Sequence, residues 1–211
     1  LKNPGMPLIM GGVTTLLDMK KSTYSYGAPE LSLASAANTD IAKWLNLLMF
    51  STGGCSDSKV LDEQASAEQM MNLFYSYHSG ANLIHDVGYI DHGTNASLES
   101  LVINEEMMRM VRQFGKGINT DKDHLALDLI EKQGPGGEYV TTDHTFDHWK
   151  EWFLPKLQDR GDYETWQQNG SKTMSDRVNE RTEKLLNEHQ PEPIEDKLKE
   201  ELNKIVAEAD K

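Results

Sequence analysis

Residues 81–91, A-N-L-I-H-D-V-G-Y-I-D, decide the fold. The short run Asn82–Ile84 has helical patterns on both sides and ends abruptly at His85 and Asp86, which predicts a buried parallel strand. In parallel α/β folds, ligands bind at the carboxyl ends of the strands, so His85 and Asp86 are candidate catalytic residues. The alternative is that both side chains only bond the neighbouring backbone at a strand end.

Two similar units precede this strand. The runs Pro7–Met10 and Leu47–Phe50 predict strands, and each is followed by a loop and then a helix, at about Pro29–Leu45 and Asp62–His78. Strand starts spaced 40 and then 35 residues apart are typical of βα units joined by crossover helices. A third helix, from Ser97 to about Phe114, follows the third strand.

After residue 118 no strand pattern recurs. We expect residues 1–118 to form βα units of a partial barrel and residues 119–211 to form a helical extension, with helices near 121–130, 142–154, 174–188 and 194–209. Three strands are too few to close a barrel, which takes eight. Because the chain opens at Leu1 without a methionine, we expect it to be a piece of a longer protein that carries the missing strands; a small open sheet is the alternative.

Composition narrows the class of protein. The 211 residues are 37% hydrophobic and 26% charged, which is typical of a soluble globular chain, and no window approaches the roughly 18 apolar residues of a membrane span. A net charge of -13 argues against nucleic acid or an anionic membrane as partner. The single cysteine, Cys55, leaves no internal disulfide and fits a reducing cytoplasm.

The loops after the predicted strands carry aromatic residues that we expect to meet over one mouth. An aromatic cage is the usual way to bind a quaternary ammonium, which offers no hydrogen-bond donor. The alternative is that these rings only pack between loops and helices. The candidate substrate-binding residues are Tyr24, Tyr26, Phe50 and Tyr89.

The loop after the second strand, T-G-G-C-S-D at 52–57, is a candidate cofactor-binding loop. Gly53 and Gly54 allow a ligand to approach the backbone closely, and Ser56 and Asp57 offer polar anchors. The spacing is not that of a nucleotide-binding fingerprint. Cys55 has no activating neighbour in the sequence and is expected to be a small buried thiol.

A metal site is the main competing interpretation. His144 and His148 stand at i and i+4 of a predicted helix, a spacing that zinc enzymes use, and His85-Asp86 with Asp91-His92 offers a second set of possible ligands. Both sets together would suit a metal-dependent hydrolase. However, the apolar side of this helix would hold Phe146 and Trp149, which places the two histidines on a polar flank, and such a pair is only half a site. We therefore expect no metal.

Several ordered motifs resemble the trimethylamine:corrinoid methyltransferase family. They are G-G-V-T-T-L-L-D-M-K at 11–20, S-Y-G-A-P-E at 25–30, G-G-C-S-D at 53–57, S-G-A-N-L-I-H-D-V-G-Y at 79–89, L-A-L-D-L-I at 125–130 and G-P-G-G at 134–137. The resemblance covers most of the chain and is weakest in the acidic helix after Pro193. It implies a (β/α)8 barrel, of which this chain is the C-terminal half plus a helical tail.

The same resemblance implies methyl transfer from a methylated amine to the Co(I) of a corrinoid (cobalamin) that a partner protein carries. Only standard residues appear, so the chain is more similar to the branch without pyrrolysine, which includes glycine betaine methyltransferases. His85 and Asp86 would then face the corrinoid or orient the substrate. A half-barrel exposes sheet edges, so we also expect association with the N-terminal half of the barrel or with a second copy. An inactive interaction fragment is the remaining alternative.

Overall fold

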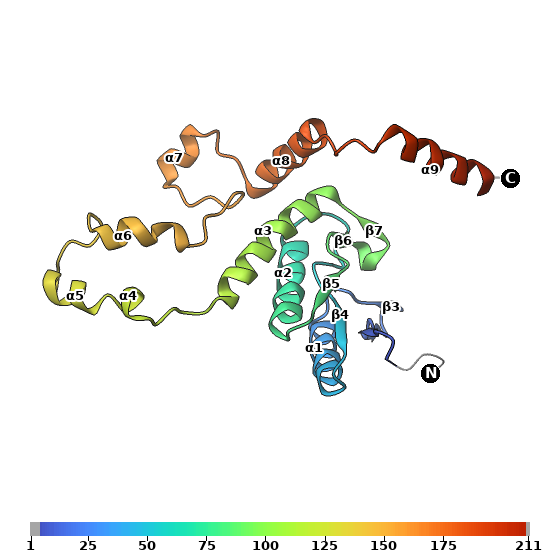
Figure 1. Ribbon diagram of the computed structural model, residues 1–211, viewed down its shortest axis with the longest axis horizontal. Coiled ribbons are helices and arrows are strands. Elements are labelled where there is room, and N and C mark those ends of the chain that lie inside the picture. Colours follow the sequence, from blue (N-terminus) through green and yellow to red (C-terminus); the bar gives the residue numbers. More distant parts are fainter. Residues whose placement is uncertain (1–4, 210–211) are drawn as a thin grey trace.

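The computed structural model describes residues 5–209, which form a mixed α/β body with a small parallel sheet and a helical extension (Figure 1). The sheet contains β1 (Ile9–Gly11), β4 (Leu48–Thr52) and β5 (Leu83–His85), hydrogen-bonded in the order β1-β4-β5. Both strand pairs are parallel. The prediction of three successive parallel strands, the last ending at His85, is therefore confirmed.

The helices between the strands begin where local chemistry favours a helix start. Pro29 lies in the first turn of α1 (Pro29–Trp44), where its missing N–H costs nothing. The Asp62 side chain accepts from the Ala65 N–H at the start of α2 (Glu63–His78), and Ser97 accepts from the Ser100 N–H at the start of α3 (Leu98–Gly115). α1 and α2 both pack against β4, so they cover one face of the sheet.

The other face of the sheet, here called the bare face, is open to solvent within the described residues 5–209. Along β4, Met49 and Ser51 are buried under the helices, whereas Leu48 and Phe50 point the opposite way and are exposed. The register pairs Ile9 with Leu48 and Phe50 with Leu83, so these apolar side chains share the bare face. β5 was expected to be buried and is only partly so, because the helices cover one of its two faces.

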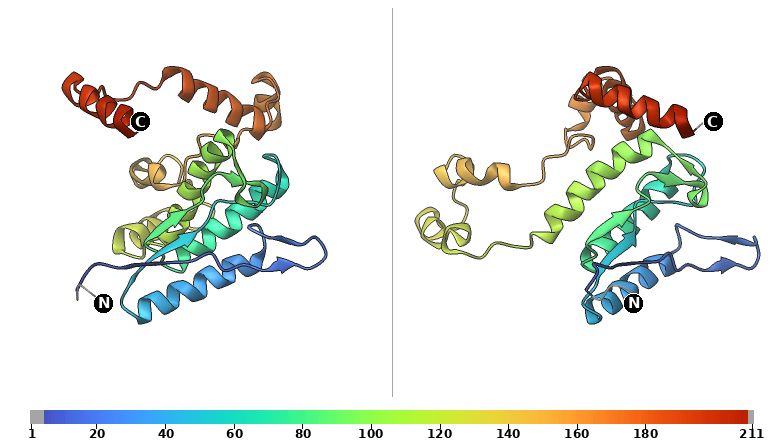
Figure 2. Two further views of the ribbon diagram at one scale, coloured as in Figure 1. Left: turned by 90° about the vertical axis from the view of Figure 1, so that its right-hand side faces the viewer. Right: turned by 45° about the vertical axis from the view of Figure 1, so that its right-hand side comes forward.

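Two hairpins were not predicted. β2 (Leu17–Asp18) pairs antiparallel with β3 (Thr23–Tyr24) in the loop after β1, and Figure 2 shows this hairpin projecting from the sheet. After β5, β6 (Tyr89–Ile90) pairs with β7 (Asn95–Ala96) around the 3-10 turn Asp91–Gly93. Strands of two residues are too short to show a period in the sequence.

The main apolar core lies between helices rather than against the sheet. Leu73 of α2, Ile103 and Met107 of α3, Val178 of α8 (Met174–Glu188) and Leu157 of a connecting loop form one buried cluster. Extension residues therefore complete the core of the βα body.

Glu106 of α3 fixes the loop that carries Leu157. Its Oε1 accepts from the backbone N–H groups of Lys156 at 2.8 Å and Leu157 at 3.0 Å, and its Oε2 accepts from Arg109 Nη1 at 2.7 Å. The Glu106 side chain is fully buried. A buried carboxylate thus joins α3 to the extension through backbone donors.

The rest of the extension runs away from the sheet (Figure 1). It comprises α4 (Lys122–Leu125), α5 (Leu127–Gln133), α6 (Asp143–His148), the 3-10 turn Trp149–Glu151, α7 (Tyr163–Gln168) and α9 (Asp196–Ala209). Every described residue of α9 is exposed, as expected for a polar terminal helix. No helix within residues 5–209 has both the length and the apolar character needed to cross a membrane.

Two helices expected in the extension have other bounds in the structure, and one helix was missed. The helix expected at 121–130 is broken at Ala126, which has a φ of 48°. The helix expected at 142–154 ends at His148, and its apolar side is not buried, since Phe146 is 76% exposed. α7 was not predicted.

Candidate functional site

The loops after β4 and β5 lie side by side at the carboxyl edge of the sheet. The Gly53 N–H donates to the His85 carbonyl at 3.0 Å, the Gly88 N–H to Gly54 at 2.8 Å, and the Ser56 N–H to Tyr89 at 3.0 Å. These bonds extend the contact between the two strands into their loops. Candidate residues from both loops are therefore held close together.

His85 and Asp86 stand at the tip of β5. His85 Nδ1 lies 2.8 Å from Asp86 Oδ1, and the His85 ring lies 4.3 Å, centroid to centroid, from the ring of Phe50 on the neighbouring strand. His85 Nε2 lies 3.4 Å from Thr52 Oγ1. His85 is thus oriented by a carboxylate on one side and an aromatic ring on another, and both its side chain and that of Asp86 remain partly open to solvent.

The backbone of this connection is strained at three positions. Asp86, Asp91 and His92 have φ values of 68°, 52° and 57°. Asp and His are among the residues that tolerate the left-handed region, yet each such residue still costs on the order of 1–3 kcal/mol. Strain held by surrounding structure is typical of functional sites, which supports a role for this loop.

The predicted aromatic residues divide into two groups. Phe50 and Tyr89 are exposed near the sheet edge. Tyr26 is partly buried, and its burial and then the negative charge of Asp86 raise its pKa. Tyr89 also contributes to this rise. Tyr24 is placed differently, exposed on β3 in the projecting hairpin. Phe50 therefore lies beside His85, and Tyr89 is bonded through its backbone N–H to the Asp86 carbonyl at 3.1 Å.

In the loop after β4, Gly53, Gly54 and Ser56 pack against neighbouring elements of the fold and do not face open space. A Cβ on Gly53 would lie 2.9 Å from Ile84 Cγ2, and one on Gly54 would lie 2.8 Å from Asn104 Oδ1. Ser56 is buried and donates to Glu68 Oε2 at 2.6 Å. Close packing against α2, α3 and β5 accounts for these residues, and their binding of a cofactor stays a prediction.

Asp57 joins three loops. It accepts from the Ser25 hydroxyl, from the Tyr26 backbone N–H at 2.6 Å and from His92 Nδ1 at 2.9 Å. His92 Nε2 in turn lies 3.0 Å from Lys59 Nζ. The sequence placed His92 with Asp91 as a possible ligand pair; the structure instead bonds its ring to Asp57, a partner 35 residues away that no local pattern reveals.

Asp57 and His92 also line an open cleft of about 910 Å³ beneath the β2–β3 hairpin. Cys55 lies between these loops and is fully buried. Burial, followed by the negative charges of Asp86 and Asp57, raises the pKa of the Cys55 thiol well above its ordinary value. The prediction that Cys55 is buried is confirmed, and its lack of reactivity stays a prediction.

Side chains able to hold a metal gather elsewhere. Among residues 5–209, the two groups with suitable ligand atoms are Asp123, His144 and His148, and His124, His148 and Glu151. Both lie in the extension, on α4, α6 and the turn after it, and α6 lies well away from β5 in Figure 1. The structure therefore does not bring His85 and Asp86 together with His144 and His148.

Comparison with known proteins identifies the chain. The model of the trimethylamine methyltransferase (MTTB) family matches residues 1–211. The chain belongs to this family. Its relatives in the trimethylamine methyltransferase family include trimethylamine methyltransferase MttB of Desulfitobacterium hafniense strain DCB-2, 34% identical over 100% of this chain and 42% of the relative.

Two further relatives match nearly as well. The glycine betaine methyltransferase of D. hafniense strain Y51 is 33% identical over 99% of this chain and 44% of its own length. Trimethylamine methyltransferase MttB of Methanosarcina barkeri strain Fusaro is 35% identical over 99% of this chain and 42% of its own. The chain therefore spans less than half the length of these trimethylamine methyltransferase family members, and the similar identities do not separate the two substrates.

Proposed function

We propose that this chain is the C-terminal part of a methyltransferase that moves a methyl group from a methylated amine to the corrinoid of a partner protein. The observation that carries the proposal is the His85–Asp86 pair beside Phe50, at the carboxyl edge of a parallel sheet, in a chain of the trimethylamine methyltransferase family.

A (β/α)8 barrel is the architecture that best accounts for the bare sheet face. Ile9, Leu48, Phe50 and Leu83 leave an apolar surface exposed opposite α1 and α2. In a closed barrel this face would form the packed interior. Because the chain spans 42% of the length of two of the relatives above, the N-terminal half of the barrel is the proposed partner for this face and for the unpaired edges.

The carboxyl edge suits a methylated ammonium ion. The exposed rings of Phe50 and Tyr89 offer aromatic faces to a cation. Asp86 brings a negative charge to the same loop: its carboxylate lies 2.8 Å from His85 Nδ1, and the His85 ring lies 4.3 Å from that of Phe50. A quaternary ammonium needs no hydrogen-bond acceptor from the protein. Rings and one carboxylate are therefore sufficient to hold it, with Tyr26 as a third ring.

The edge also presents an open apolar and aromatic surface around the His85 imidazole, which fits a broad planar group delivered by another protein. A bound corrinoid supplies a strongly nucleophilic Co(I), so the protein needs no base to generate a nucleophile. A quaternary amine leaves as a neutral amine and needs no acid. The work of His85 and Asp86 is then to orient the substrate.

Within the family we place the chain with enzymes that act without pyrrolysine, such as those for glycine betaine. The support is that its 211 residues are all standard ones. The substrate carboxylate of glycine betaine would have to avoid Asp86. Lys59, whose Nζ lies 3.0 Å from His92 Nε2 and 3.6 Å from Asp91 Oδ1, offers positive charge for it.

The test uses the full-length protein that contains this chain, mixed with cob(I)alamin and one amine at a time. We expect absorbance changes of methylcobalamin formation with glycine betaine, and less or none with trimethylamine. Formation with trimethylamine alone would overturn the assignment of branch. No methylcobalamin with any methylated amine would overturn the proposed function.

A metal-dependent hydrolase built from both histidine pairs has no support in the arrangement, because α6 lies away from β5. The proposal also makes this chain by itself inactive and prone to self-association through its sheet edges. Light scattering of the isolated 211-residue chain should then show dimers or larger species, and a clean monomer would contradict the half-barrel.

A further inference from the structure

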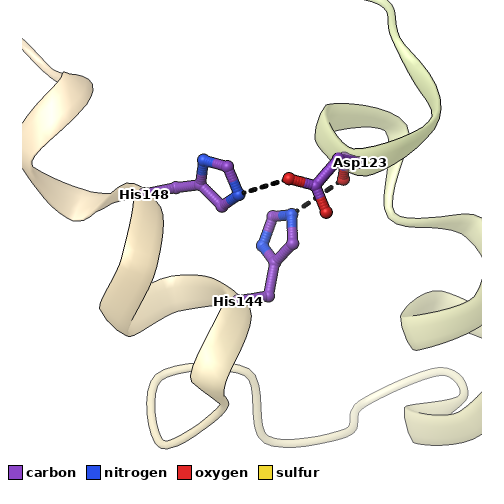
Figure 3. Close-up of side chains that lie close together, drawn as sticks. All are labelled: Asp123, His144 and His148. Carbon is purple, nitrogen blue, oxygen red and sulfur yellow. Dashed lines mark hydrogen bonds and ion pairs between the residues drawn. The ribbon is translucent and has the colours of Figure 1, made fainter.

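The histidine cluster of the extension forms a site of its own, independent of methyl transfer. His144 and His148 lie one turn apart on α6, with ring centroids separated by 4.3 Å, and both rings point at Asp123 of α4 (Figure 3). His148 Nε2 lies 3.0 Å from Asp123 Oδ2, and His144 Nε2 lies 2.9 Å from the Asp123 carbonyl oxygen. Two imidazoles and one carboxylate thus converge from two separate helices.

A second layer of groups stands behind the first. His148 Nδ1 lies 2.7 Å from Glu151 Oε1, and His124 Nε2 lies 2.9 Å from Glu151 Oε2. His124 Nδ1 in turn lies 2.9 Å from Asp121 Oδ1. A carboxylate that accepts from the far nitrogen of a metal-bound histidine is the usual arrangement around protein metal sites, because it fixes the ring and its tautomer.

Three carboxylates surround the histidines of this cluster, those of Asp121, Asp123 and Glu151. Both ring nitrogens of His148 have a carboxylate oxygen within 3.0 Å. An ion bound at His148 Nε2 would replace the contact with Asp123 Oδ2 by one bond to nitrogen and one to oxygen, and would leave the contact with Glu151 in place.

We propose that Asp123, His144 and His148 bind one divalent transition-metal ion of the zinc type, which joins α4 to α6. Imidazole and carboxylate ligands suit zinc, at metal–ligand distances of about 2.0–2.2 Å. Tetrahedral ligands at that distance are about 3.4 Å apart, and the ligand atoms here already lie within 4.8 Å of one another. Asp123 is 74% exposed and free to turn, so closing the gap needs only side-chain rotation.

The overlapping group His124, His148 and Glu151 is the less favourable arrangement. A metal there would displace both hydrogen bonds that Glu151 accepts. At Asp123, His144 and His148, the ion replaces only the two contacts with Asp123, and the Glu151 and Asp121 bonds remain. The pair at i and i+4 also presents its two nitrogens from one rigid helix.

The fold gives such an ion a structural task. No residue of 112–156 is buried, and apolar side chains such as Val140 and Trp152 are largely exposed. A segment without its own core needs another source of stability, and a bound metal is one that small folds use. In the histidine cluster, two side chains of α6 contact Asp123 of α4.

The experiment is metal binding to the full 211-residue chain after removal of metal with a chelator. We expect one equivalent of Zn²⁺ by titration calorimetry, one equivalent of Co²⁺ with the visible absorption of a tetrahedral site, and no binding of Mg²⁺, which prefers oxygen ligands. Zn²⁺ should also slow hydrogen exchange across residues 121–151. This exchange reports the site without any methyl-transfer activity.

Variants assign the ligands. His144→Ala and Asp123→Asn should abolish stoichiometric binding, and Glu151→Gln should weaken it by about 10–100-fold. Asp147→Asn on the same helix and His189→Ala at the end of α8, both exposed, should bind like the unchanged chain. Loss of binding in His124→Ala with binding retained in His144→Ala would overturn this ligand set, and no stoichiometric zinc in the unchanged chain would overturn the site.

Discussion

Glu106 offers a prediction whose size follows from the structure. Its fully buried carboxylate accepts two short backbone hydrogen bonds, from Lys156 and Leu157, and pairs with Arg109. Each hydrogen bond to a charged group contributes about 1.5–3 kcal/mol. Arg109 is partly exposed and regains water when its partner is lost, so the sum of all three bonds overstates the effect.

For Glu106→Ala we therefore expect the free energy of unfolding to fall by about 3–5 kcal/mol, the range for breaking a buried pair. Glu106→Gln keeps an oxygen at the backbone donors and loses only the ion pair, so it should cost about 1–2 kcal/mol. The neighbouring Glu105, more than half exposed, supplies the control, and Glu105→Ala should change stability by no more than about 0.5 kcal/mol.

The assay is urea unfolding of the 211-residue chain, followed by circular dichroism. The difference between the two variants at one position is the decisive quantity. Equal losses for Glu106→Ala and Glu106→Gln would show that the backbone donors at 156–157 do not depend on this side chain. A loss below about 1 kcal/mol for Glu106→Ala would refute the reasoning altogether.

The remaining predictions concern the loops and the histidine cluster. Gly54 has a φ of 75°, and a Cβ added there would lie 2.8 Å from Asn104 Oδ1, so Gly54→Ala should lower the free energy of unfolding in urea by about 2–4 kcal/mol. Gly117→Ala, where the added Cβ meets open space, should lower it by only about 1 kcal/mol. Equal losses for the two variants would contradict the packing argument. Cys55 should react with a disulfide reagent at pH 8 only as fast as the protein unfolds, because burial raises the pKa of its thiol; rapid labelling of folded protein would refute this. A hydrogen bond to Glu151 raises the pKa of His148, and one to Asp121 raises the pKa of His124. In metal-free protein the stability that these two histidines contribute is therefore complete below about pH 6.5 and is lost as the pH rises through the raised pKa values. The pKa of Glu151 is lowered by its bonds to the histidines, so its contribution to stability is lost in acid. Hydrogen exchange of residues 121–151, corrected for intrinsic rates, should be slowest between about pH 5 and 6.5, and equal protection at pH 8 would contradict this.

The sequence predicted the fold correctly where the local pattern of apolar residues matches the burial in the structure. The strands β1, β4 and β5 and the helices α1, α2 and α3 follow the βα period, and the helix expected to start at Ser97 is capped by that side chain. His85 was placed at the end of its strand because an apolar run stops there. These features depend on neighbours in the sequence, so a local pattern is able to show them.

The rest depends on contacts between distant segments. Ala126 has a left-handed backbone that its residue type disfavours, so no local rule predicts the break there. The pairing of His92 with Asp57, and of His148 with Asp123, joins residues 35 and 25 positions apart. The helix expected at 142–154 failed because its apolar side found no partner surface within the described chain, so periodicity alone overestimated its length.

The central claim is that methyl transfer takes place at the His85–Asp86 tip of β5. The most direct measurement is the rate of methylcobalamin formation by the full-length protein carrying His85→Ala, with folding checked by circular dichroism and Cys55 accessibility. We expect a fall of about 100-fold, the size that follows from misplacing a reacting group by about 1 Å. An unchanged rate in a folded variant would contradict the claim.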